Sequence, residues 1–157
     1  MYNPYDWEKY PVRKRTRLKG YDYSLPNVYF VTVCTHDRKC LFGKAGDCNR
    51  YGKMAEDGIL RIPDHFPQVQ ILKYVVMPNH VHILLRISGG DRKLDRIIGN
   101  WKAYVTREIH RFQPEMKIWQ TSFHDHIIRN EQAFQKIWLY IEGDPMNWDK
   151  DCFFTET

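Results

Sequence analysis

Two stretches near the middle of the chain have the pattern of β-strands joined by a tight turn. Residues 71–76 (ILKYVV) and 81–87 (VHILLRI) are rich in β-branched and aliphatic side chains, and Pro78 and Asn79 between them favour a reversal. Runs of this kind bounded by turn residues predict an antiparallel hairpin. An earlier run, residues 28–35 (VYFVTVCT), is apolar on both faces and predicts a central strand.

Apolar positions spaced three and four residues apart predict two amphipathic helices. The stripe of the first helix consists of Leu94, Ile97, Ile98, Trp101, Val105 and Ile109, and that of the second of Phe134, Ile137, Trp138 and Ile141. Asp91 is the expected N-cap of the first helix, whose outer face is basic, and Asp144-Pro145 ends the second. Residues 43–58 predict a loop and part of a helix running toward Pro63, and residues 117–128 contain a short strand-like piece.

The order strand, helix, hairpin, helix, strand, helix predicts an α+β fold in which an antiparallel sheet is covered by helices. With 157 residues, 43% of them hydrophobic, the chain can bury one core and is too short for two ordinary domains. It contains no run of about 18 apolar residues, and residues 1–10 are polar and aromatic. We therefore expect a cytoplasmic protein that neither spans nor binds a membrane.

Basic residues are concentrated in residues 9–19, a segment without acidic residues. The formal net charge is +5, which suits an anionic partner. The residues expected to contact phosphates are Arg13, Lys14, Arg15, Arg17 and Lys19. Tyr21 and Tyr23 follow them and can stack on bases. We expect residues 1–19 to form a basic arm and residues 20–157 to form one domain; a solvated basic terminus is the alternative.

Two histidines at the start of the second hairpin strand are spaced for a shared metal ion. Because side chains alternate along a strand, His80 and His82 project to one side while Val81 faces the core. The group His124-Asp125-His126 has the same spacing and can supply ligands, a supporting carboxylate or DNA contacts; for metal binding, a polar strand edge is the preferred interpretation. The four cysteines form no CxxC pair and are expected to be free thiols.

A tyrosine on the last helix is placed for nucleophilic chemistry. Tyr140 falls roughly 110° from the centre of the apolar stripe, so we do not expect it to be a core residue of that stripe. Asp144 lies one turn further on the same side, and we expect both side chains to point toward whatever the helix covers. Tyr104 lies nearer the first stripe and is expected to be a packing residue. A tyrosine can form a covalent link to a phosphodiester beside a metal held by two histidines and one carboxylate. Imidazole ligands suit manganese, zinc or iron on softness, so spacing does not name the metal.

These motifs resemble a known family. Residues 75–82 (VVMPNHVH) look like the HUH motif of the single-tyrosine transposases. The segments that resemble the REP-associated tyrosine transposases are residues 20–24 (GYDYS), 29–32 (YFVT), 118–120 (IWQ) and 123–130 (FHDHIIRN), followed by Tyr140-Ile141 and Pro145. The resemblance implies a ferredoxin-like or RRM-like sheet that carries His80 and His82 as metal ligands.

The same resemblance implies a reaction and a substrate. Tyr140 would attack single-stranded DNA that forms hairpins from REP-like palindromes, with magnesium or manganese, leaving a 5′-phosphotyrosine and a free 3′-OH. Asp144 matches the third ligand, where the family commonly has Asn or Gln, and His126 has a supporting role. Monomers and homodimers both occur among such enzymes.

Two other classes of function fit part of the pattern. A nucleic-acid-binding module with an RRM-like sheet would use the basic arm and the aromatic residues but would have no need for His80, His82 and Tyr140. A replication initiator or relaxase would share the chemistry and differ in substrate. The length of the chain favours the small transposase type.

Overall fold

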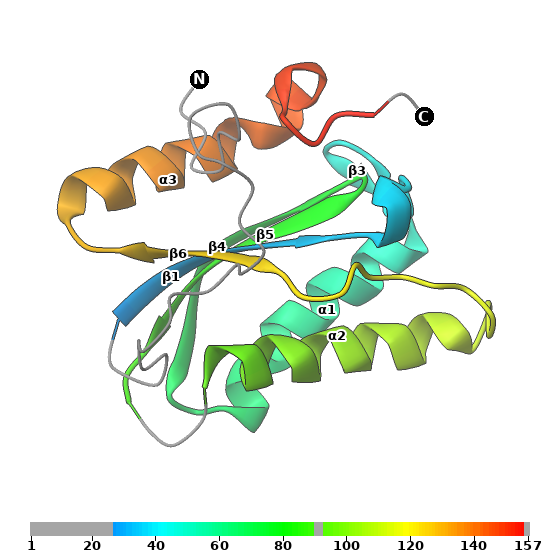
Figure 1. The fold of residues 1–157 in the computed structure, drawn as a ribbon, viewed down its shortest axis with the longest axis horizontal. Helices are drawn as coiled ribbons and strands as arrows, with labels where there is room; N and C mark the ends of the chain where they lie inside the picture. Colours follow the sequence, from blue (N-terminus) through cyan, green and yellow to red (C-terminus); the bar gives the residue numbers. More distant parts are fainter. Residues whose placement is uncertain (1–26, 90–92, 156–157) are drawn as a thin grey trace.

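A four-stranded antiparallel sheet forms the centre of the protein. The computed structural model describes residues 27–89 and 93–155. The strands are β1 (Asn27–Cys34), β4 (Val69–Met77), β5 (His80–Ile87) and β6 (His124–Ile128), in the order β4-β5-β1-β6 (Figure 1). Two helices separate the strands in a β-α-β-β-α-β arrangement, which is the ferredoxin-like topology. The predicted α+β fold and its order of elements are confirmed.

One face of the sheet is covered by two long helices, α1 (Arg50–His65) and α2 (Leu94–His110) (Figure 1). The six apolar positions predicted for the α2 stripe are all buried in the core beneath them. The helices approach closely at Gly58, where a Cβ would lie 2.8 Å from the Tyr104 ring and 2.9 Å from that of Trp101. Trp101 Nε1 also donates a hydrogen bond to the Ala55 carbonyl (3.0 Å). Tyr104 is therefore a packing residue, as predicted.

The opposite face is covered by α3 (Glu131–Gly143) and a smaller apolar core (Figure 1). The buried positions of α3 are Ile137, Tyr140 and Ile141, and Asp144 follows directly after the helix. Phe134 and Trp138 are only half-buried and stack on each other at the side of the helix, with ring centroids 5.9 Å apart. The prediction that Tyr140 is not a core residue of the α3 stripe was wrong, because Tyr140 is buried with Ile137 and Ile141 in the smaller core. Its expected direction, toward what the helix covers, agrees with the structure.

The remaining elements are short. They are the 3-10 helices η1 (His36–Arg38) and η2 (Asp144–Lys150) and the two-residue strands β2 (Gly43–Lys44) and β3 (Asp47–Cys48). The strand-like piece before residue 124 contributes one isolated bridge, between Thr35 and Trp119. In the described part of the chain, no helix is long and apolar enough to cross a membrane.

The first residues of α1 and α2 differ in how they are capped. Asn49 caps α1, since its side chain accepts hydrogen bonds from the backbone N–H groups of Tyr51 and Gly52 (3.0 Å each). At α2, Lys93 occupies the N-cap position without a capping side-chain bond. The predicted cap, Asp91, lies outside the described residues, as does the basic arm of residues 1–19.

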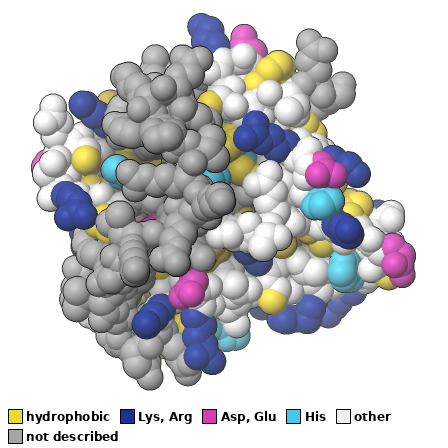
Figure 2. Space-filling view, viewed as in Figure 1, with side chains coloured by type: hydrophobic (Ala, Val, Ile, Leu, Met, Phe, Trp, Pro, Cys, Tyr) yellow, Lys and Arg dark blue, Asp and Glu magenta, His cyan; other side chains and the backbone are white. Residues whose placement is uncertain are grey.

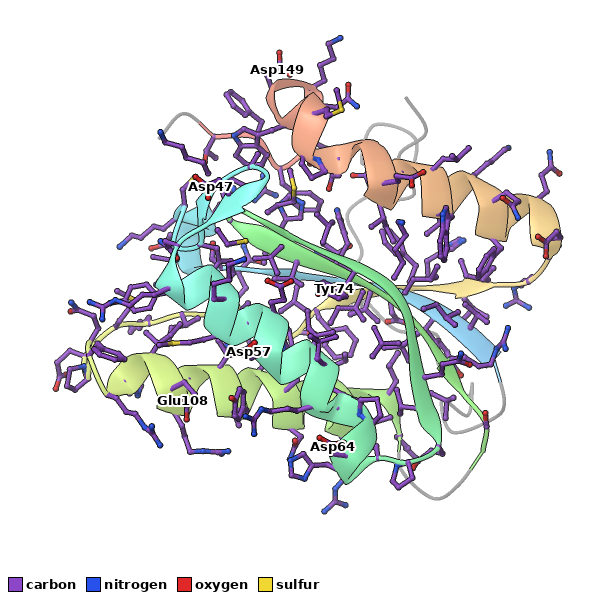
Figure 3. The ribbon with its side chains drawn as sticks, turned by 180° about the vertical axis from the view of Figure 1, so that it is seen from behind. Asp47, Asp57, Asp64, Tyr74, Glu108 and Asp149 are labelled. Atoms are coloured by element: carbon purple, nitrogen blue, oxygen red, sulfur yellow. The ribbon has the colours of Figure 1, made fainter. Side chains whose placement is uncertain are left out.

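Charged side chains of both signs cover the described surface. Lysines and arginines are spread around the face seen in Figure 2 without gathering in one patch. Behind it, Asp57, Asp64 and Glu108 interrupt the basic residues of α1 and α2 (Figure 3). Lys102, predicted on the basic outer face of α2, donates hydrogen bonds to the backbone carbonyls of Gln120 and Ser122 (2.9 and 3.2 Å). The outer side of α1 and α2 is therefore not a uniform basic surface.

Candidate active site

The β4–β5 hairpin places two histidines side by side on the α3 face of the sheet. Met77 pairs with His80 across a two-residue turn made by Pro78 and Asn79. The strand alternation puts Val81 into the large core and leaves both imidazoles on the other face, with centroids 4.6 Å apart. Both histidines are completely buried. The predicted pairing of His80 and His82 on one side is confirmed.

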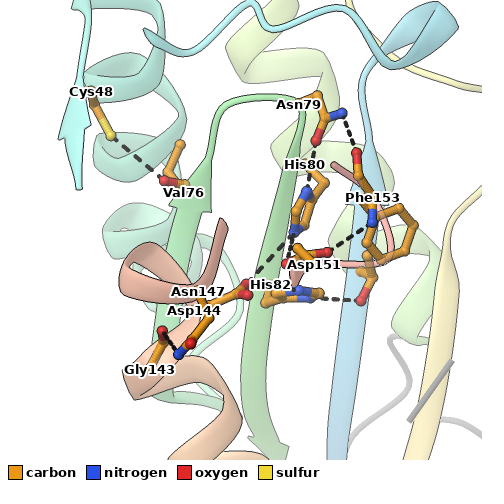
Figure 4. Close-up of polar contacts among 11 residues, drawn as sticks. Cys48, Val76, Asn79, His80, His82, Gly143, Asp144, Asn147, Asp151 and Phe153 are labelled. Atoms are coloured by element: carbon orange, nitrogen blue, oxygen red, sulfur yellow. Dashed lines mark hydrogen bonds and ion pairs between the residues drawn. The ribbon is translucent and has the colours of Figure 1, made fainter. Parts of the chain in front are cut away.

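Two carboxylates meet these imidazoles, one directly after α3 and one directly after η2 (Figure 4). The Oδ2 atom of Asp144 lies 3.2 Å from His82 Nε2 and 3.7 Å from His80 Nε2. The Oδ2 atom of Asp151 lies 3.6 Å from His80 Nε2. One ligand atom from each of the four residues lies within 4.8 Å of all the others.

The second nitrogen of each imidazole has a fixed partner. Asn79 donates through Nδ2 to the Phe153 carbonyl (2.8 Å), so its Oδ1 is the acceptor for His80 Nδ1 (2.9 Å). His80 therefore carries its proton on Nδ1 and presents the Nε2 lone pair to the carboxylates. The Thr32 hydroxyl is hydrogen-bonded to His82 Nδ1 (2.7 Å). Such outer hydrogen bonds orient metal-ligating histidines.

The four residues fit a divalent cation. Both Nε2 atoms, both Asp144 carboxylate oxygens and Asp151 Oδ2 are buried without a hydrogen bond. Because buried polar atoms are almost always satisfied in native proteins, this convergence of lone pairs calls for a positive centre among them. Two imidazoles with two carboxylates form a ligand set that manganese, iron and zinc accept.

The pKa values match the ligand role of these groups. Burial, reinforced by the neighbouring His82, holds the pKa of His80 well below its usual value, so the imidazole is neutral. Burial raises the pKa of Asp151 to about 6, helped by the neighbouring Asp144 carboxylate. For Asp144, burial opposes ionisation, but contact with His82 outweighs it and the pKa is lowered. Neutral imidazoles are the forms that bind metal.

Tyr140 lies next to this cluster. Its ring centroid is 5.4 Å from that of His82 and 6.2 Å from that of Phe30, and the residue is 5% exposed. Since Asp144 follows one helical turn later, α3 positions both the phenol and a carboxylate against the histidines. The structure thus brings together four residues singled out from the sequence: Tyr140, His80, His82 and Asp144.

His126 lies on the same face of the sheet but outside the cluster. It pairs with Phe30 across β1 and β6, and directly opposed residues in antiparallel strands share a face. Burial, together with Arg129, lowers its pKa, and the half-buried imidazole lies two strands from β5. His126 therefore has no contact with the four-residue cluster among the described residues, and its supporting role stays a prediction.

Asp151 is the site residue that the sequence did not indicate. It follows η2 in an irregular segment, where no periodicity shows which way a side chain points. Its neighbour Phe153 is buried against His80, with ring centroids 4.7 Å apart. An acidic residue between aromatic residues is the only local signal, and that signal is weak.

Comparisons with known proteins identify the family of the chain. The family model of the IS200-like transposases matches residues 27–144, which include His80, His82, Tyr140 and Asp144. A Haemophilus influenzae protein of uncharacterized function is 29% identical, with 92% of this chain and 94% of that protein covered. A second H. influenzae protein, named by inference as a REP-associated tyrosine transposase, is 22% identical over 80% and 73% of the two chains.

Two solved structures share the fold. One is a REP-associated tyrosine transposase bound to a REP hairpin, with a TM-score of 0.68 and 23% identity, covering 85% of this chain and 74% of that one. The other is a Deinococcus radiodurans R1 protein named by inference as a transposase, with a TM-score of 0.54 and 20% identity, covering 82% and 97%. The resemblance found in the sequence is confirmed at the level of the family. The chain belongs to the IS200-like transposase family.

Proposed function

We propose that this transposase cleaves and rejoins single-stranded DNA through a covalent bond to Tyr140, with a divalent metal held by His80, His82 and Asp144. The observation that carries the proposal is the convergence of buried, unsatisfied nitrogen and oxygen atoms beside one tyrosine ring. A protein that only binds DNA gains nothing from burying such a cluster, because unpaired buried polar groups reduce stability.

The phenol would act as the nucleophile. The Tyr140 oxygen forms a bond to the scissile phosphorus and loses its proton, while the bond from phosphorus to the 3′ oxygen breaks and that oxygen takes up a proton. The product is a 5′-phosphotyrosine with a free 3′-OH, which retains the energy for rejoining. A bound divalent cation would polarise the scissile phosphate and offset its negative charge. Thr32 and Asn79 would keep the two imidazoles oriented.

The metal would be magnesium or manganese. Carboxylate oxygens favour these harder ions, and manganese also accepts imidazole nitrogen. Asp144 stands where related enzymes commonly have a neutral amide, and its contact with His82 at 3.2 Å supports its role as a ligand. Tyr140 contacts His82 of its own chain, so a monomer would contain a complete site.

The substrate would be single-stranded DNA with imperfect palindromes that fold into hairpins. One solved structure with this fold is bound to a REP hairpin, which supports the same class of substrate here. The basic arm would contact phosphates through Arg13, Lys14, Arg15, Arg17 and Lys19. Deleting residues 1–19 should weaken hairpin binding and flatten its salt dependence in a titration; an unchanged salt slope would make the arm a passive tail.

A denaturing-gel assay for covalent adducts tests the proposed reaction. Labelled hairpin DNA should give a protein adduct with Mn²⁺ or Mg²⁺ and none with a chelator. Tyr140→Phe should lose the adduct and retain hairpin binding, whereas Tyr104→Phe, a matched change at a packing residue, should retain both. Adducts that persist in Tyr140→Phe would refute the nucleophile. Tight binding without any adduct would favour a non-cutting binding module.

A further inference from the structure

We propose that Asp151 is a fourth metal ligand that occupies the place of the DNA phosphate until the substrate arrives. The inference rests on the proposed metal-dependent function and assigns a role to the C-terminal segment, defined here as residues 151–155. It goes beyond the three ligands indicated by the family pattern, because Asp151 lies after residue 144, where the match to the family model ends.

The orientation of Asp151 is fixed by the backbone. Its Oδ1 accepts a hydrogen bond from the Phe153 N–H (2.8 Å), which turns Oδ2 toward the cluster. That second oxygen lies 3.6 Å from His80 Nε2, and both atoms are buried without a hydrogen bond. The carboxylate therefore presents one oxygen to the backbone and one to the proposed metal (Figure 4).

The C-terminal segment is attached directly to a metal ligand. Asn79 donates to the Phe153 carbonyl (2.8 Å) and accepts from His80 Nδ1 (2.9 Å), so one buried amide connects the segment with the imidazole. The Phe153 ring also lies against His80, and the Arg38 guanidinium lies over the Phe153 ring, 5.5 Å from its centroid. Movement of the segment would therefore alter the surroundings of His80 directly.

Charge explains why a fourth ligand is needed in this conformation. Two neutral imidazoles and one carboxylate leave a divalent cation with one uncompensated positive charge, and an unpaired buried charge is strongly unfavourable. Asp151 supplies the second negative charge and makes the buried site neutral. A phosphodiester also carries one negative charge, so the scissile phosphate can replace Asp151 without changing the charge of the site.

Burial requires that the exchange be accompanied by movement. His80 and His82 are fully buried, Asp144 is 1% exposed, and Phe153 and Trp148 lie against His80. A DNA phosphate can reach these residues only after part of this covering moves away. The C-terminal segment contains both a covering residue, Phe153, and the ligand that the phosphate would replace, Asp151.

Manganese binding in the absence of DNA tests the fourth ligand. Using the full chain and electron paramagnetic resonance of free Mn²⁺, we expect Asp151→Asn to weaken binding about tenfold or more. Asp149→Asn is the matched control, because Asp149 is exposed on η2 two residues earlier (Figure 3) and should bind as the unchanged protein does. Equal affinity of the Asp151→Asn variant and the unchanged protein would overturn the inference.

A third variant separates this inference from the proposed function. Loss of Mn²⁺ binding in Asp144→Asn with normal binding in Asp151→Asn would overturn the fourth ligand alone. Absence of Mn²⁺ binding by the unchanged protein would overturn both the metal site and the inference. Circular dichroism would verify that each variant is folded.

Hydrogen exchange provides a test that does not depend on substitution at Asp151. Mn²⁺ should slow amide exchange in peptides covering residues 151–155, because the metal would fasten the segment. Hairpin DNA added to the metal-loaded Tyr140→Phe variant should restore fast exchange there, since the phosphate replaces Asp151. Exchange in this segment that ignores Mn²⁺, or protection that persists with DNA bound, would contradict the proposed replacement.

Discussion

The two faces of the sheet are built differently from the same strands. On the face covered by α1 and α2, the inward-facing β5 residues Val81, Ile83 and Leu85 join a large apolar core. On the α3 face, the same strand presents His80 and His82 and only one apolar residue, Leu84, to a much smaller core. Successive residues of β5 therefore lie in two different environments, an apolar core and a cluster of polar groups.

This difference separates the face that stabilises the fold from the face that carries the proposed active site. The helix-pair face, which is the face covered by α1 and α2, removes apolar surface from water, and this burial is the main favourable term in folding. The α3 face buries imidazole and carboxylate groups without hydrogen-bond partners, which reduces stability in the absence of a cation. Active sites commonly retain such unfavourable arrangements because the reaction requires them. The large core provides the stability that allows the α3 face to hold these groups.

The largest effect on stability is expected from the helix-pair face. Ile83→Ala removes a fully buried side chain from the large core and should lower the free energy of unfolding by about 2–5 kcal/mol, measured by urea denaturation. Under conditions where the variant is folded, its Mn²⁺ affinity should match that of the unchanged protein. A loss below about 1 kcal/mol would show that the core beneath α1 and α2 is not the main source of stability.

A smaller effect is expected from a hydrogen bond behind a ligand. Thr32→Val keeps the shape of the side chain and removes the partner of His82 Nδ1, so Mn²⁺ affinity should fall about 10–100-fold by calorimetry. The control is Thr106→Val on α2, where the hydroxyl donates to the Lys102 carbonyl (2.8 Å) and should not influence metal binding. Equal affinities in the two variants would show that His82 needs no such support.

The smallest effect is expected from removing a site carboxylate when no metal is present. In a chelator, Asp151→Asn should leave the free energy of unfolding unchanged or raise it by about 1 kcal/mol, because a buried carboxylate without a counter-ion is unfavourable. With Mn²⁺ the order should reverse, since the unchanged protein gains more from binding. A clear loss of stability in chelator would instead identify Asp151 as a structural residue.

Much of this architecture follows from local patterns in the sequence. The alternation at His80, Val81 and His82 and the helical stripe ending at Ile109 were sufficient to predict the hairpin, α2 and the two-sided strand. These signals are reliable because burial on one face fixes a period of two or 3.6 residues. The structure confirms the hairpin, α2 and the strand with one apolar and one polar face.

The parts that the sequence did not predict depend on tertiary contacts. The burial of Tyr140 follows from how α3 lies on the sheet, and a helical stripe weighted toward Phe134 and Trp138 pointed to a neighbouring side. Asp151 lies in an irregular segment whose direction is set by contacts with Asn79 and Phe153. Neither arrangement has a periodic signal.

Mass spectrometry of the tryptic peptide that carries the DNA tests the proposed tyrosine nucleophile most directly. Cleavage after Lys136 and Lys150 releases residues 137–150, in which Tyr140 is the sole tyrosine. After reaction with hairpin DNA and Mn²⁺, and digestion of the DNA, we predict a nucleotide attached to this peptide at Tyr140. A nucleotide found on another peptide would contradict Tyr140 as the nucleophile, and an adduct formed equally well in chelator would contradict the metal dependence of the reaction.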